Sequence, residues 1–151
     1  MTYTVTPEQM IVLQLIQSCE TPVKSNQRVQ KLIFLLDEKL KENFEIYNWK
    51  KYDYGPYSKQ LQKDIRYLDN RDFIDKQTTP TLSGNTRIKY MTTHKTEPIL
   101  SDFIETEPNF KPIVEEIEEL VMEYDSKSTR QLVHLVYDSN PEYIENSVWR
   151  L

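Results

Sequence analysis

The chain contains very little glycine, cysteine and histidine. Its 151 residues include only 2 glycines, Gly55 and Gly84, which excludes glycine-rich phosphate loops and dinucleotide-binding fingerprints. A single cysteine, Cys19, cannot form an internal disulfide, and its position in an apolar helical pattern predicts a buried, unreactive thiol. The 2 histidines, His94 and His134, lie far apart in the sequence. Zinc sites need three or four ligands at organised spacing, so we expect no metal site.

Long apolar segments are also absent from the sequence. No apolar run approaches the length of about 20 residues that spans a bilayer, and we therefore expect no membrane association. The first ten residues, MTYTVTPEQM, lack a basic segment followed by an apolar one, so we expect no secretory signal. Together with the single cysteine, these features predict a cytoplasmic protein.

Residues that could support catalysis do not form a recognisable constellation. A nucleophile needs a base and an orienting group, whereas Ser58 opens a helix after a Pro-aromatic turn and is better explained by local capping. Asp53, just before a Gly-Pro turn, is of the type that binds local backbone. The paired glutamates of residues 115–119 surround a helix and do not converge on one point. We therefore expect no enzyme, no catalytic residue and no cofactor.

Charge is distributed unevenly along the chain, whose net charge is −5. Residues 1–95 hold 15 Lys and Arg against 11 Asp and Glu, a net charge of +4. Residues 96–151 hold 4 against 13, a net charge of −9. A basic part can bind nucleic acid while an acidic part faces away, although acidic helices can also simply be solvated.

The most informative segment runs from Trp49 to Asp69. It predicts an aromatic extended stretch, a turn at Gly55-Pro56, and a helix from about residue 57 to residue 70. Glycine permits a sharp turn, and proline suits the first turn of a helix because its missing N–H has no partner there anyway. The structural turn comprises Tyr54, Gly55, Pro56 and Tyr57. The helix has one apolar stripe, formed by Leu61, Ile65 and Leu68.

Capping and periodicity predict the elements before this segment. Thr6 is a candidate N-cap, with Pro7 at the first helical position and Gln9 completing a capping box, for a helix that ends near Cys19. Ser25 or Asn26 can cap a second helix. Its wide apolar face, formed by Val29, Leu32, Ile33, Leu36 and Leu40, predicts a central position.

Two strands and further helices are expected after the segment of residues 49–69. Phe73 and Ile74 open a strand of about six residues, a turn follows at residues 80–85, and residues 86–93 return as a half-exposed strand. Residues 98–104 predict a short helix. Pro112 opens a strong acidic helix, and Ser128 or Thr129 can cap another that ends at Asn140-Pro141. The terminal Trp149 and Leu151 are expected to pack back on the body.

This order predicts an α+β, mostly α, fold: a winged helix-turn-helix with a C-terminal helical extension. We assign residues 1–95 to the winged-helix-like domain and residues 96–151 to an acidic helical extension, packed on it or forming a dimer surface. In a winged helix-turn-helix, the helix of residues 57–70 enters the major groove of DNA and the following hairpin is the wing.

A candidate DNA-binding surface follows from this arrangement. Cations and amides recur on the polar side of the helix and near the wing, where they could contact phosphates and base edges. Four interleaved acidic residues, Asp64, Asp69, Asp72 and Asp75, would oppose it. The candidate DNA-binding residues are Lys59, Gln62, Lys63, Arg66, Arg71, Lys76, Arg87 and Lys89.

Three segments carry a family resemblance. VQKLIFLLDEKL followed by YDYGPYSKQLQKDIRYLDNRDFI, with QLVHLVYDSNPEY later, resembles the small prokaryotic YwgA-like proteins and, more distantly, the SocA-like antitoxin (Panacea) domain. Lys31-Leu32, residues 54–57 and Leu61 lie on the shared pattern. The resemblance implies a helical, winged-helix-like domain. It links the chain to toxin–antitoxin systems, protease adaptors, mobile elements and DNA-associated regulation, and carries over no catalytic residue.

These observations lead to two functional hypotheses. The first is a non-enzymatic, DNA-binding transcriptional regulator of a mobile-element (prokaryotic or viral) or toxin–antitoxin type, with double-stranded DNA as its partner. The second is an adaptor or antitoxin that binds a protein, such as a toxin or a protease, through the same fold without DNA. The apolar surplus of the C-terminal helices, at Ile113, Ile117, Leu120, Val121, Leu132 and Leu135, also suggests a homodimer, with intramolecular packing as the alternative.

Overall fold

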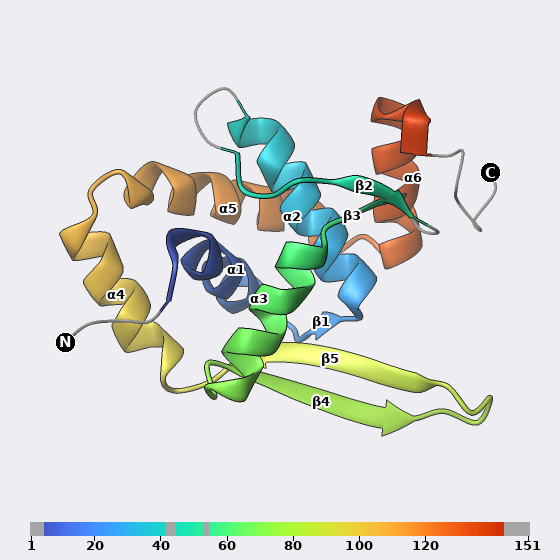
Figure 1. Cartoon of the computed structure of the whole chain (residues 1–151), viewed down its shortest axis with the longest axis horizontal. Coiled ribbons are helices and arrows are strands. Elements are labelled where there is room, and N and C mark those ends of the chain that lie inside the picture. Colours follow the sequence, from blue (N-terminus) through green and yellow to red (C-terminus); the bar gives the residue numbers. More distant parts are fainter. Residues whose placement is uncertain (1–4, 42–44, 53–54, 144–151) are drawn as a thin grey trace.

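The computed structural model describes residues 5–41, 45–52 and 55–143, and this part of the chain folds as α+β. Its helices are α1 (Pro7–Ser18), α2 (Asn26–Leu40), α3 (Lys59–Asn70), α4 (Thr96–Thr106), α5 (Phe110–Tyr124) and α6 (Thr129–Ser139), followed by the short 3-10 helix η1 (Pro141–Tyr143) (Figure 1). Its strands are β1 (Val23–Lys24), β2 (Lys50–Tyr52), β3 (Gly55–Tyr57), β4 (Ile74–Pro80) and β5 (Thr86–Thr92). None of the described helices is long and apolar enough to cross a membrane.

The strands form two small antiparallel sheets. In the larger sheet the order is β1-β5-β4, so that the first strand of the chain pairs with the last. Val23 of β1 lies opposite Tyr90 of β5, and Ile74 of β4 lies opposite Thr92. The hairpin β4–β5 projects from the helical body, whereas β2 and β3 form a separate hairpin between α2 and α3 (Figure 1).

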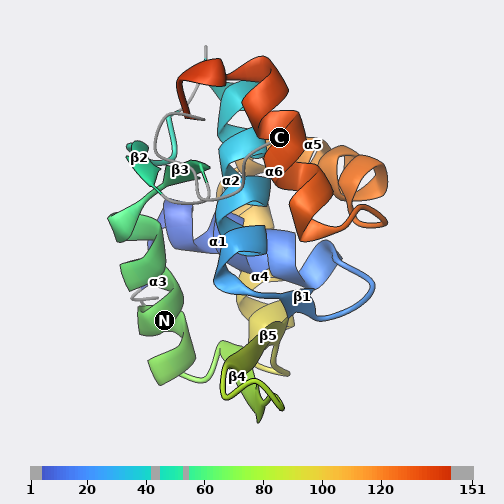
Figure 2. The same cartoon turned by 90° about the vertical axis from the view of Figure 1, so that its right-hand side faces the viewer.

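The helices are stacked in layers around α1 and α2. Turned by 90°, the molecule shows α3 on one side of these two helices and α5 and α6 on the other (Figure 2). Every residue of α1 from Gln9 to Ile16 is buried, as expected for a helix that is apolar on nearly all sides. We expected α2 to be the central helix, but α1 is more completely enclosed.

Local capping explains where several helices begin. The predicted capping box of α1 is confirmed: the Gln9 backbone N–H donates to Thr6 Oγ1 and the Thr6 N–H donates to Gln9 Oε1. Ser128 and Gln131 form the same reciprocal pair at the start of α6. Ser58 caps α3 by accepting from the Leu61 N–H at 3.2 Å, which confirms the local capping role that we expected for this serine.

The segment before α3 differs from the prediction. Pro56 does not open the helix: it lies in β3 opposite Lys51 of β2, and α3 begins only at Lys59. Gly55 has a φ of +97°, a conformation that glycine adopts without steric cost, and it lies in the strand rather than in the turn. Pairing with β2 therefore extends the backbone through Tyr57, and the cap at Ser58 sets the start of the helix. Tyr54 lies outside the described residues.

The C-terminal helices share one core with the rest of the molecule. Ile117, Leu120 and Val121 of α5 and Leu132 of α6 belong to the same buried cluster as α1 and α2. Helix α5 begins at Phe110, two residues before the predicted proline. Trp149 and Leu151 lie outside the described residues.

Candidate nucleic-acid interface

Helix α3 separates an apolar face from a basic one. Leu61, Ile65 and Leu68 are at most 1% exposed, as their spacing predicted. Three cations occupy the exposed side at intervals of four and three residues, and none of them forms a salt bridge with another described residue. These residues, which we call the helix stripe, are Lys59, Lys63 and Arg66.

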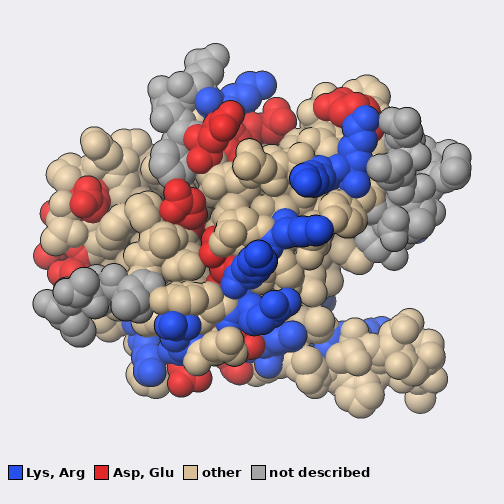
Figure 3. Space-filling model, viewed as in Figure 1, with Lys and Arg blue, Asp and Glu red and all other residues tan. Residues whose placement is uncertain are grey.

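Basic side chains gather along α3 on one face of the molecule (Figure 3). In the space-filling view the basic atoms follow α3 and continue toward the β2–β3 hairpin, whereas acidic atoms gather over α4 and near the end of α2 (Figure 3). The projecting tip of the β4–β5 hairpin is uncharged in this view. The helix stripe is thus part of a longer basic band, in which uncharged atoms separate the basic groups (Figure 3).

The beginning of α3 is fixed to α2 by two reciprocal hydrogen bonds. The backbone N–H of Ser58 donates to Gln30 Oε1 at 2.9 Å, and Gln30 Nε2 donates to the Ser58 carbonyl at 3.0 Å. Both residues are buried. A single amide therefore satisfies both backbone groups of the residue that caps α3, and it fixes where the helix stripe begins.

Asp64 does not oppose the helix stripe, although it lies between its members in sequence. It is 6% exposed and points toward α1. Its carboxylate accepts from Gln9 Nε2 at 3.0 Å, from Gln60 Nε2 at 3.0 Å and from the Tyr47 hydroxyl. Burial, followed by the hydrogen bond to Asp64, raises the pKa of Tyr47 well above its usual range. The carboxylate is therefore buried away from the helix stripe and bound by Gln9, Tyr47 and Gln60.

The other acidic residues near the candidate surface differ from one another. Asp72 forms an ion pair with Lys95 at 3.8 Å, and Asp75 accepts from Gln77 at 3.2 Å. Asp69 is half-buried near the end of α3. Repulsion of phosphates would therefore come chiefly from the end of α3 and the start of β4. The first two turns of α3 would contribute little.

Gln62 is half-buried rather than fully exposed. Its Nε2 donates to Asn26 Oδ1 at 3.3 Å, and the same oxygen accepts from the Tyr90 hydroxyl. The amide oxygen of Gln62 is buried without a partner among the described residues. Reading adenine with this side chain would require the bond to Asn26 to break, so its role at a base edge stays a prediction.

The register of the β4–β5 hairpin divides the predicted wing cations between two faces. Lys76 lies opposite the buried Tyr90, so it shares the face that packs toward the helices. Lys89 lies opposite Gln77, and Arg87 lies opposite Thr79, on the other face because side chains alternate along a strand. Lys24 of β1 is the partner of Lys89. We call Lys24, Arg87 and Lys89 the outer sheet surface; the first of them was not predicted.

Aromatic side chains adjoin the basic band at both ends of α3. The Arg71 guanidinium lies 3.5 Å from the centre of the Tyr67 ring, a cation–π contact that orients it. On the β2–β3 hairpin, the rings of Tyr52 and Tyr57 lie 4.9 Å apart, and Tyr52 is 37% exposed. Of the aromatic group at residues 47–57, Tyr47 is core and Tyr52 is surface.

The predicted structural turn is buried against two distant segments. A Cβ atom on Gly55 would lie 3.0 Å from Cε1 of Tyr137 in α6 and 3.5 Å from Cε of Lys31 in α2. The Lys31 ammonium donates to the Pro56 carbonyl at 3.0 Å, and burial lowers the pKa of this lysine to about 8. The three segments that carry the family resemblance therefore meet at one contact.

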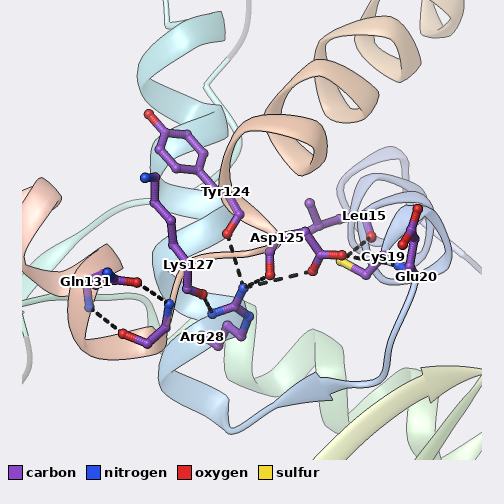
Figure 4. Close-up of polar contacts among 9 residues, drawn as sticks. Leu15, Cys19, Glu20, Arg28, Tyr124, Asp125, Lys127 and Gln131 are labelled. Carbon is purple, nitrogen blue, oxygen red and sulfur yellow. Dashed lines mark hydrogen bonds and ion pairs between the residues drawn. The ribbon is translucent and has the colours of Figure 1, made fainter.

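A second polar cluster lies at the turn between α5 and α6 (Figure 4). Arg28, 7% exposed at the start of α2, donates to the carbonyls of Tyr124, Asp125 and Lys127 at 3.2, 2.9 and 2.6 Å. Tyr124 and Asp125 end α5, where helix carbonyls lack partners within the helix, and Lys127 lies in the turn that follows. The guanidinium also lies 3.9 Å from the Asp125 carboxylate. Because one side chain binds three backbone carbonyls, this cluster stabilises the turn.

Cys19 borders the same cluster. Its thiol donates to the Leu15 carbonyl at 3.3 Å, and burial, followed by the charge of Asp125, raises its pKa to about 12. The side chain is half-buried, somewhat more open than expected. Within residues 5–41, 45–52 and 55–143, no three His, Cys, Asp or Glu side chains are placed to hold a metal ion.

Comparison of the chain with known protein families found no match, and comparison with curated proteins found none either.

Proposed function

We propose that the chain is a non-enzymatic, DNA-binding regulator in which α3 enters the major groove. The observation that carries this proposal is the helix stripe: Lys59, Lys63 and Arg66 are exposed, aligned and without ion-pair partners among the described residues. Seven residues of helix span about 10 Å, comparable with the major-groove width of about 12 Å. Cations so spaced can contact phosphates at the groove edges while α3 lies between them.

The fold supports this proposal through its connectivity. A winged helix-turn-helix runs helix, strand, helix, helix, strand, strand, and its first strand pairs with its last. The chain has this order in α1, β1, α2, α3, β4 and β5, with the β1-β5-β4 sheet. It departs from the simplest form because the β2–β3 hairpin is inserted between α2 and α3. In this assignment β4–β5 is the wing.

The family proposal rests on one contact. We infer that the chain is a YwgA-like or SocA-like (Panacea) protein because the segments of the resemblance, around Lys31, Gly55 and Tyr137, pack against one another. A sequence pattern that defines a fold is expected to include residues that contact one another in that fold. A setting in a toxin–antitoxin system or a mobile element, in the cytoplasm, is part of the same proposal.

The second candidate function is a protein-binding adaptor or antitoxin. An observation favours it: α4 and α5 line a groove with an apolar floor and several glutamates, a surface that would repel DNA. The two functions are compatible because α3 contributes no residue to this groove.

Duplex binding by the full chain tests the DNA-binding proposal. Fluorescence anisotropy with a labelled mixed-sequence duplex should show binding that weakens as salt rises. Replacing Lys59, Lys63 and Arg66 by Ala should reduce the log–log salt slope by about 0.9 for each lost phosphate contact. The matched control replaces Lys39, Lys41 and Lys111, which lie outside α3 and β5, and should leave the slope unchanged.

Two results would contradict the proposal. Absence of duplex binding at low salt would favour the protein-binding function. Equal losses in the two triple variants would show that net charge, and not α3, determines the affinity.

A further inference from the structure

The described surface contains a groove between the start of α1, the end of α2, and helices α4 and α5. Its volume is about 770 Å³, within the range of roughly 300–1,000 Å³ that is typical of binding sites. Ile11, Leu40 and Phe110 are buried at its floor, at 0, 8 and 4% exposure. Phe103 and Ile113 are only half-buried there. The floor is therefore apolar and partly open to solvent.

The floor of the groove is held in shape by an aromatic pair. The rings of Phe103 in α4 and Phe110 in α5 lie 4.8 Å apart in an edge-to-face arrangement, the geometry that aromatic pairs prefer. Pro7 and Pro112 also line the groove, at the first turns of α1 and α5. Helix ends therefore supply much of the lining of the groove.

The lining of the groove is strongly acidic. Its glutamates form no salt bridge with another described residue. Lys39, the lining cation, pairs with Glu123 at 3.7 Å, so its charge is offset. An anionic ligand, including DNA, would be repelled here. The lining glutamates are Glu107, Glu115, Glu116 and Glu119.

We propose that this groove binds an amphipathic helical segment of a protein partner that presents apolar side chains flanked by Lys or Arg. Apolar side chains would cover Phe103 and Ile113, and the flanking cations would pair with Glu115 and Glu119. Helix-in-groove recognition uses this combination of apolar anchors and a charged border. The proposal does not rest on DNA binding, because α3 contributes no residue to the groove.

Synthetic peptides test the proposed chemistry. The probe is a fluorescein-labelled helix of about 15 residues with leucines at spacings of three and four and lysines at the other positions. One comparison peptide replaces lysine by glutamate, and another replaces leucine by serine. In anisotropy titrations with the full chain, the leucine–lysine peptide should bind at least about tenfold more tightly than either comparison, since each loses one class of contact.

Charge reversal locates the binding. Glu115→Lys with Glu119→Lys should weaken binding of the leucine–lysine peptide by about tenfold or more. The control, Glu105→Lys with Glu118→Lys, makes the same change in net charge at exposed positions of α4 and α5 outside the groove. It should alter binding by less than about twofold. Equal losses in both variants would overturn the proposal, as would absence of binding by the unaltered chain.

Sedimentation distinguishes a protein partner from the other candidate occupant of the groove, a second copy of the chain. The unaltered chain should sediment with the same coefficient across micromolar concentrations if the groove serves a different protein. A concentration-dependent dimer that the Glu115 and Glu119 reversals dissociate would assign the groove to self-association and overturn the proposal. Duplex binding by the same variants is a separate measurement, and we expect it to be retained, so failure here is distinguishable from failure of the DNA proposal.

Discussion

Gln30 and Ser58 exchange two hydrogen bonds across the contact between α2 and α3, one at 2.9 Å and one at 3.0 Å. Gln30 is fully buried and Ser58 is 2% exposed. The residue that caps the proposed DNA-binding helix is thus held by a side chain of the neighbouring helix, which ties the start of α3 to α2.

Removal of this amide should destabilise the protein. Gln30→Leu leaves the buried backbone N–H of Ser58 without its Gln30 partner, while the Ser58 carbonyl keeps the bond from the Gln62 N–H. The free energy of unfolding should fall by about 2 kcal/mol. Gln27→Leu, at a half-buried position of the same helix, is the control and should change it by less than about 1 kcal/mol. Urea denaturation followed by circular dichroism measures both, and similar losses would contradict the role of the pair.

The two glycines should differ in their tolerance of a methyl group. Both have positive φ, +97° at Gly55 and +86° at Gly84, but a Cβ would contact Tyr137 only at the former. Gly84→Ala should therefore cost about 1 kcal/mol from backbone strain alone, and Gly55→Ala should cost more. Thermal unfolding compares them. Equal melting temperatures would show that the structure adjusts around Tyr137.

Lys31 should make stability depend on pH at alkaline values. Its pKa is about 8 in the folded protein, below its ordinary value of 10.5. Between these values the unfolded chain binds a proton that the folded chain does not, so the contribution of Lys31 to stability rises with pH. Relative to Lys31→Met, the unaltered chain should gain on the order of 3 kcal/mol from below pH 8 to above pH 10.5.

The comparison with Lys31→Met is essential because other groups titrate in the same range. The pKa of Cys19 is raised to about 12, which makes stability fall as pH rises past the ordinary thiol value. This contribution is common to both proteins and cancels in the difference. Denaturation midpoints measured at several pH values provide the test, and a difference that does not change with pH would contradict the lowered pKa.

Arg28 should not be replaceable by lysine. The guanidinium donates to three carbonyls at the end of α5 and the turn after it, and a single ammonium cannot reproduce this planar geometry. Arg28→Lys should cost about 2 kcal/mol or more, whereas Arg87→Lys on the exposed face of β5 should cost nothing measurable. If hydrogen exchange at the end of α5 were equal in the two variants, Arg28 would not hold this turn.

Local sequence signals predicted the starts of α1 and α6, because capping depends on residues three positions apart. Thr6 caps α1 and Ser128 caps α6. The starts of α3 and α5 each lie two residues from the predicted positions. The apolar stripe of α3 also followed from spacing alone. The same spacing places Asp64 beside Leu61 and Leu68, so its inward direction could have been inferred. Its donors, Gln9 and Tyr47, come from other elements and could not.

Other features depend on contacts that no local pattern reveals. Pro56 suits a helix start in isolation, but pairing of β3 with β2 overrides this preference. The division of Lys76 from Arg87 and Lys89 depends on the register of β4 and β5, and a shift of one residue would reverse the faces. The turn at residues 80–85 was predicted, but the pairing of the two strands that it joins was not. The predicted wing cations therefore included residues from both faces of the hairpin.

The state of Cys19 has a practical consequence. With its pKa near 12 and its hydrogen held by the Leu15 carbonyl, the thiol is almost entirely protonated at neutral pH and reacts slowly with alkylating reagents. A cysteine introduced at an exposed position such as Lys89 or Glu118 would therefore be labelled selectively by a maleimide dye. The native cysteine can remain in place, and distances from each surface to a bound duplex or peptide become measurable by fluorescence energy transfer.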